Sequence, residues 1–124
     1  GGYHNISHHG KDEAKLKQLA EIEIGQMELL NELLQGLNDV EESNSTLLDN
    51  TMVLYGCHMG DANIHNNKNL PVILAGGGFK HGQHLAFNSD NKAPLANLYV
   101  SMLQNMGLDR SKFASSTGTL TGLS

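Results

Sequence analysis

Two short and largely apolar runs, at residues 51–55 and 71–75, most constrain how this 124-residue chain can fold. Each run is followed by glycine and bounded by polar segments, which is the pattern of a short strand. Because the apolar residues are continuous rather than alternating, we expect a sheet covered on both faces. Residues 83–87 are predicted to form a third, edge strand.

A long amphipathic helix is predicted before these strands. From about Asp12, apolar residues recur every three or four positions, and the pattern ends between Gly36 and Asp39. The apolar face is wide, so we expect the helix to be well covered. Residues 40–50 are polar and are interpreted as a surface connection.

A second helix is predicted after the strands. Pro94 suits its first turn, where a missing N–H costs nothing, and Gly107 suits its end. Residues 109–124 are rich in Ser, Thr and Gly and are interpreted as an irregular tail. This order of helices and strands predicts a single α/β unit. The inner face of the second helix is predicted to comprise Leu95, Leu98, Tyr99, Met102, Leu103 and Met106.

Charge and cysteine content exclude several classes of protein. Lys and Arg number 8 against 13 Asp and Glu, and a formal net charge of −5 argues against binding to a nucleic-acid backbone. No apolar stretch is long enough to span a membrane. A single cysteine, Cys57, excludes an internal disulfide framework.

The first segment with chemical potential is the run His-Asn-Ile-Ser-His-His at residues 4–9. Neutral imidazole is the commonest metal ligand in proteins. In an extended chain His8 and His9 would point to opposite sides. We therefore expect His4 and one of this pair to face a metal, while the other orients a ligand. The alternative is a solvated loop.

The second such segment is the loop at residues 57–65, which follows the first predicted strand. Open α/β sheets place their sites in loops at the ends of strands. Asp61 and His65 supply ligand types suited to zinc or manganese. Two alternatives stay open, in which Cys57 is a small buried residue and Asp61 only shapes the turn.

Other candidate motifs are weaker. The glycines at 76–78 favour a tight turn over a phosphate-binding loop, because no Lys-Ser/Thr follows them. His81 and His84 beside this turn are interpreted as surface residues. Ser7 adjoins histidines, but sequence neighbours seldom reach the geometry of a catalytic triad.

Residues 3–10 (Tyr-His-Asn-Ile-Ser-His-His-Gly) resemble the defining signature of the HXXSHH family, bacterial proteins of unknown function. The resemblance covers nearly the whole chain. It implies that a large N-terminal part precedes this chain, and that the protein is secreted or periplasmic in a Gram-negative bacterium. It continues through residues 48–51, 60–65, 69–78, 94–99 and 106–107.

The chain is more distantly similar to the alkaline phosphatase and sulfatase superfamily. There, an Asn-Thr pair leads into a strand that ends in a metal-binding Asp-His pair. By position His58 stands at the first of that pair, whereas Met59 replaces the second. His4 and His8 match an earlier ligand segment. The similarity implies the C-terminal portion of a layered fold, with helices packed on a mostly parallel sheet and the nucleophile in the N-terminal half.

The sequence thus predicts part of a metal-dependent hydrolase acting on a phosphate or sulfate ester. Its partner would be the N-terminal part of the same protein, without which we expect no activity. The rival hypothesis is a non-catalytic secreted binding or assembly module. The predicted ligands of zinc or manganese are His4, His8, Asp61 and His65, and the acid/base candidates are His9 and His58.

Overall fold

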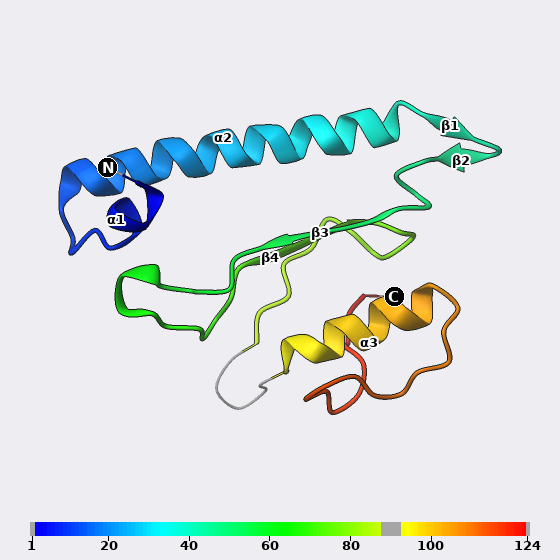
Figure 1. The fold of residues 1–124 in the computed structure, drawn as a ribbon. Helices are drawn as coiled ribbons and strands as arrows, with labels where there is room; N and C mark the ends of the chain where they lie inside the picture. The colour runs from blue at the N-terminus through cyan, green and yellow to red at the C-terminus, as the bar shows by residue number, and fades with distance from the viewer. Residues whose placement is uncertain (1, 88–92, 124) are drawn as a thin grey trace.

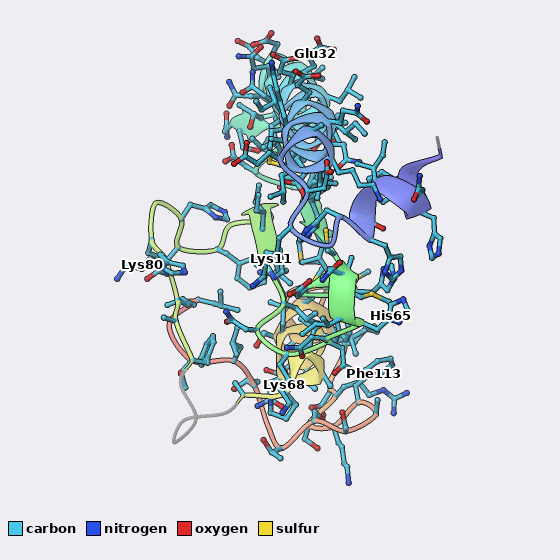
Figure 2. All side chains as sticks on the ribbon, turned by 90° about the vertical axis from the view of Figure 1, so that its left-hand side faces the viewer. Lys11, Glu32, His65, Lys68, Lys80 and Phe113 are labelled. Atoms are coloured by element: carbon cyan, nitrogen blue, oxygen red, sulfur yellow. The ribbon has the colours of Figure 1, made fainter. Side chains whose placement is uncertain are left out.

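The computed structural model describes residues 2–87 and 93–123 and has a mixed α/β architecture, as predicted (Figure 1). The helices α2 and α3 lie on opposite sides of a pair of strands, β3 and β4 (Figures 1 and 2). The elements are α1 (Tyr3–Ser7), α2 (Glu13–Asn38), β1 (Glu41–Glu42), β2 (Ser45–Thr46), β3 (Met52–Gly56), the 3₁₀ helix η1 (Ala62–Ile64), β4 (Val72–Gly76) and α3 (Leu95–Asn105).

The long helix α2 begins and ends where the sequence predicts. The Asp12 carboxylate caps its first turn by accepting a 2.9 Å hydrogen bond from the backbone N–H of Lys15. A helix of 26 residues is roughly 39 Å long. Neither α2 nor any other described helix combines the length and apolarity needed to cross a membrane.

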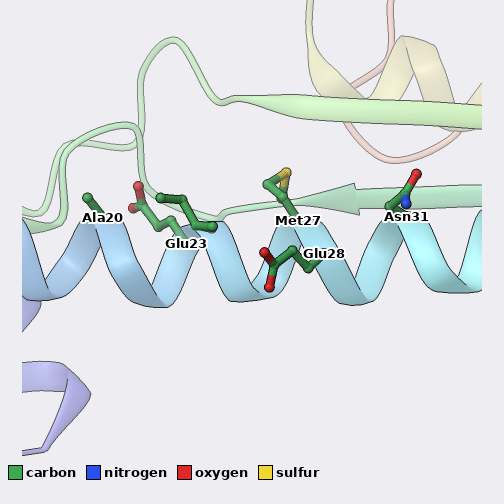
Figure 3. Close-up of a pocket in the computed structure, with 6 residues that line it drawn as sticks. Ala20, Glu23, Met27, Glu28 and Asn31 are labelled. Atoms are coloured by element: carbon green, nitrogen blue, oxygen red, sulfur yellow. The ribbon is translucent and has the colours of Figure 1, made fainter.

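The expectation that α2 is well covered is wrong for the described residues, since none of its residues is buried. Leucines and isoleucines lie on both flanks of the helix, and Ile24 is 59% and Leu29 66% exposed. One flank forms an open hollow of about 490 Å³, lined by α2 alone (Figure 3). Glu32 instead lies on the side of α2 that faces away from the strands (Figure 2).

The strands β3 and β4 confirm both predicted strands, each displaced by one residue. They pair antiparallel, with Met52 opposite Gly76 and Gly56 opposite Val72. The described residues contain no parallel pair, so the expected mostly parallel sheet is not found in them. The connection between the strands holds only a short 3₁₀ helix, whereas a parallel pair is usually joined by a crossover that contains an α-helix.

The predicted edge strand at residues 83–87 is also wrong, because this segment adopts no strand. Residues in and next to this segment form hydrogen bonds with the C-terminal tail instead of with a neighbouring strand. The backbone N–H of Lys80 donates to the carbonyl of Leu123 at 2.9 Å, and the side-chain amide of Gln83 donates to the carbonyl of Gly122. The polar connection at residues 40–50 contains the small β1–β2 hairpin.

The buried hydrophobic side chains of the described chain all belong to the helix α3. Val100 is 0% exposed, and Leu98 is also buried. The predicted inner face is therefore partly wrong, since it omitted Val100 and included Met106, which is 64% exposed. Pro94 lies at the N-cap, one position earlier than predicted, and Gly107 follows the C-cap with a left-handed φ of 80°.

Residues 109–123 form no helix or strand but fold back onto α3. The buried side chain of Asn97 accepts a 2.8 Å hydrogen bond from the backbone N–H of Thr117 and donates to its hydroxyl at 3.2 Å. Ser101 accepts from the N–H of Leu120 at 2.9 Å. These bonds satisfy polar groups whose burial would otherwise be costly.

We predict that Gly76→Ala unfolds the protein far more readily than Gly78→Ala. Both glycines have left-handed φ angles, of 70° and 73°, which cost an L-residue about 1–2 kcal/mol. A Cβ at Gly76 would also overlap the carbonyl oxygens of Thr51 and Leu48, whereas nothing lies within 4 Å of one at Gly78. Urea unfolding should give a loss of about 2–5 kcal/mol for Gly76→Ala. Equal losses in the two variants would contradict this packing.

Candidate functional site

A groove of about 1020 Å³ lies between α1, α2 and the loop that follows β3. Its lining includes residues from both histidine-containing segments that the sequence singled out. The structure therefore brings to one cavity all six predicted site residues, which are His4, His8, His9, His58, Asp61 and His65.

The central feature of the groove is a row of three imidazoles. The ring of His8 lies between those of His4 and His65, with a centroid distance of 4.6 Å to each and interplanar angles of 66° and 87°. Residues 3–7 form the short helix α1, and His8 is its C-cap. A helix places residues four apart on one face, which explains why His4 meets His8.

His65 reaches this row from the loop after β3. Its backbone has a φ of 52°, in the left-handed region that non-glycine residues seldom adopt. It forms the end of η1, directly before a bridge between Asp61 and Asn66 closes the loop. In Figure 2 His65 lies at the end of the molecule that faces the viewer. Such strained residues persist only where their surroundings fix them.

Asn63 joins the two histidine-containing segments. Its side-chain oxygen accepts a 2.8 Å hydrogen bond from the backbone N–H of Gly10, and its carbonyl oxygen lies 3.3 Å from Nδ1 of His8. A ring nitrogen that faces a carbonyl carries the proton, so Nε2 of His8 is left with its lone pair. The sequence did not single out Asn63, because nothing local reveals a partner more than 50 residues away.

Asp61 has the turn-forming role that the sequence left open as an alternative. One carboxylate oxygen accepts a 2.9 Å hydrogen bond from the backbone N–H of Asn63 and caps η1. Gly60 precedes it, and a Cβ there would overlap the carbonyl of Lys68. The loop is thus held in shape by Asp61 and Gly60, and Asp61 still borders the groove.

Ser7 and His9 lie beside the row of imidazoles, and the side chains of both already form hydrogen bonds with the backbone. Ser7 is buried and its hydroxyl donates to the carbonyl of His4 at 2.9 Å. Nδ1 of His9 accepts a 3.0 Å hydrogen bond from the backbone N–H of Lys11. A neutral His9 therefore carries its proton on Nε2, where it can donate a hydrogen bond, and neither ring nitrogen is left free to ligate a metal.

Tyr3 and Cys57 border the same groove. Partial burial raises the pKa of the Tyr3 phenol, and the nearby Cys57, Glu23 and Tyr55 raise it further by disfavouring a phenolate. The phenol therefore stays protonated at neutral pH and is a hydrogen-bond donor to the groove. Cys57 is exposed, so its interpretation as a small buried residue is wrong.

The donor chemistry fits a divalent ion, since zinc and manganese take imidazole and carboxylate ligands. The positions of these side chains do not form a complete metal site. In residues 2–87 and 93–123, no three His, Cys, Asp or Glu side chains are disposed as a group that could hold a metal ion. The rings meet edge to face, so they are gathered without forming a coordination shell.

Comparisons of the chain with protein-family models, curated proteins and solved structures gave no match. The resemblance to the HXXSHH family and to the alkaline phosphatase superfamily therefore stays a prediction.

We predict that Asn63→Ala exposes the Gly10 amide, whereas Asn63→Asp preserves its protection. Alanine removes the oxygen that accepts from Gly10, and a bond of this kind contributes about 1 kcal/mol. Hydrogen exchange of the Gly10 N–H, followed by NMR, should accelerate about fivefold in Asn63→Ala. Unchanged exchange in that variant would mean that Asn63 does not join the two segments.

Proposed function

We propose that this chain carries part of a divalent-metal site that serves the hydrolysis of a phosphate or sulfate ester. The observation that supports it most is the row of His4, His8 and His65, which come from two distant segments and line one groove. Asp61 adds a carboxylate to the same lining. Imidazoles and carboxylates converging on a cavity are the usual components of hydrolytic metal sites.

Each residue has a distinct role in this proposal. His4, His8, His65 and Asp61 would hold the ion, which supplies Lewis acidity and lowers the pKa of bound water. The bond between Nδ1 of His8 and the Asn63 carbonyl fixes the tautomer that presents Nε2, as is usual for metal-ligating histidines.

The acid/base roles fall to His9 and His58. His9 is the candidate acid, and in its neutral form its Nε2–H would donate a hydrogen bond to the leaving-group oxygen. His58 borders the groove from the loop after β3 and is the candidate base.

We further propose that β3 and β4 belong to a larger sheet of the alkaline phosphatase type, completed by an N-terminal part of the same secreted or periplasmic protein. The continuous apolar character of both strands and the exposed flanks of α2 support this. Both features are typical of elements that pack against further structure.

A second candidate function is a non-catalytic binding module with the same fold. Two observations favour it. The histidine rings do not surround a common point, and one oxygen of Asp61 is engaged in its own turn. In the protein that includes its N-terminal part, turnover of p-nitrophenyl phosphate or sulfate that a chelator abolishes would support the enzyme, whereas that protein with neither metal nor turnover would support the module.

We predict that the 124-residue protein retains zinc or manganese after dialysis, and that His8→Ala and His65→Ala lose most of it. His8→Ala leaves both His4 and His65 without their neighbouring ring, and His65→Ala leaves only the pair of His4 and His8. Metal content measured by atomic emission tests this.

His84→Ala is the matched control, because His84 is exposed and is not part of the groove lining. It should retain the wild-type metal content. If His8→Ala binds as much metal as the wild type, the ligand assignment is wrong.

A further inference from the structure

The sequence contains two triplets of the form Asn-x-Ser/Thr, the pattern by which asparagine is recognised for N-glycosylation in secreted proteins. One occupies residues 5–7 (Asn-Ile-Ser) in α1, and the other occupies residues 44–46 (Asn-Ser-Thr) in the β1–β2 hairpin. Such triplets arise easily by chance, so the surroundings of each asparagine decide whether it can act as an acceptor.

The hairpin presents its asparagine to solvent. Asn44 is exposed in the two-residue turn between β1 and β2. The two strands pair at only two positions, and a hairpin of this size is marginally stable, so it opens at little cost for an enzyme that binds an extended chain. The hairpin lies beyond the C-terminal end of α2, at the opposite end of that helix from α1 (Figure 1). A saccharide on Asn44 would therefore leave the histidine-lined groove uncovered.

The side chains on either side of Asn44 are also suited to recognition. The hydroxyl of Thr46, the third residue of the triplet, donates an exposed 2.9 Å hydrogen bond to Asp49, and water or an enzyme can replace this partner. The exposed Glu42 stands two positions before Asn44. Bacterial oligosaccharyltransferases select for an acidic residue at this position, which distinguishes the hairpin triplet from a chance Asn-x-Ser/Thr.

The triplet in α1 is held in a form that an enzyme cannot bind readily. Ser7 is only 7% exposed, and its hydroxyl donates to the carbonyl of His4 at 2.9 Å. The side-chain oxygen of Asn5 accepts a 3.3 Å hydrogen bond from the ammonium of Lys15. Presenting this triplet would require α1 to unwind and to leave α2. The residue two positions before Asn5 is Tyr3, which carries no carboxylate.

From these differences we infer that Asn44, and not Asn5, is an acceptor for N-linked glycosylation by a bacterial oligosaccharyltransferase. The co-reactant is a saccharide carried on a polyprenyl diphosphate. The side-chain nitrogen of Asn44 forms a bond with the anomeric carbon, whose bond to the diphosphate oxygen breaks. The polyprenyl diphosphate leaves with that electron pair, and the amide nitrogen gives up one proton. The inference rests on the proposed secreted or periplasmic location, where such saccharides are available, and not on the proposed hydrolysis.

The test incubates the folded 124-residue protein with a purified bacterial oligosaccharyltransferase and an undecaprenyl-diphosphate-linked oligosaccharide. Intact mass spectrometry should show a gain of one oligosaccharide, and peptide mapping should place it on residues 44–46. Asn44→Gln should show no gain. The Asn44 side chain is exposed, so this variant should fold.

Asn5→Gln is the matched control, because it removes the other acceptor triplet and leaves the hairpin intact. It should gain the same mass as the wild type. His8→Ala should also be modified, whatever metal it binds, so failure of this inference is distinguishable from failure of the metal site.

Three results would overturn the inference. No gain by the folded protein, or a gain only after unfolding in urea, would show that the hairpin is no acceptor in the native fold. A gain that persists in Asn44→Gln and is lost in Asn5→Gln would assign the modification to α1. A second oligosaccharide on Asn5 of the folded wild type would show that the fold does not discriminate between the two triplets.

Discussion

The candidate site depends on the hydrogen bonds by which Asn63 connects its two histidine-containing segments. Asn63 binds the backbone of Gly10 with its side chain and faces Nδ1 of His8 with its carbonyl. The helix α1 has only five residues and is too short to be stable by itself, so it depends on these contacts and on the hydrogen bonds of Lys15 to Asn5 and His8. With them, the short helix is fixed against the loop after β3, and the rings of His4 and His8 meet that of His65. The loop in turn keeps its shape through the Asp61 cap and the close approach at Gly60.

The helix α2 connects this site to the rest of the chain. At its start the ammonium of Lys15 bonds the carbonyl of His8, and further along Gln26 accepts a 2.9 Å hydrogen bond from the Tyr55 hydroxyl of β3. Beyond the second anchor, Leu29 and Leu33 remain exposed along the groove. The same apolar residues that make α2 a poor candidate for an isolated surface helix thus give the groove its aliphatic wall. A site of this composition combines a polar, histidine-rich end with a surface that favours apolar groups.

Much of the fold follows from local patterns in the sequence. The Asp12 cap, the periodicity of α2 and the two apolar runs predicted their elements to within a residue, because caps and periodicity act over a few positions. The direction of strand pairing, the missing strand at residues 83–87 and the buried face around Val100 were mispredicted, because they depend on distant partners. The same distinction holds for the site. Residue types in two segments indicated the histidines and Asp61, whereas the contribution of Asn63 depends on contacts that no local pattern encodes.

The central claim is that His4, His8 and His65 act as one unit. Its most direct test is a zinc titration of protein with ¹⁵N-labelled histidine, followed through the ring nitrogen resonances. The account predicts that the resonances of these three residues shift together at the same zinc concentration, while those of His81 and His84 remain unchanged. Independent shifts of the three rings, or shifts confined to His81 and His84, would contradict it.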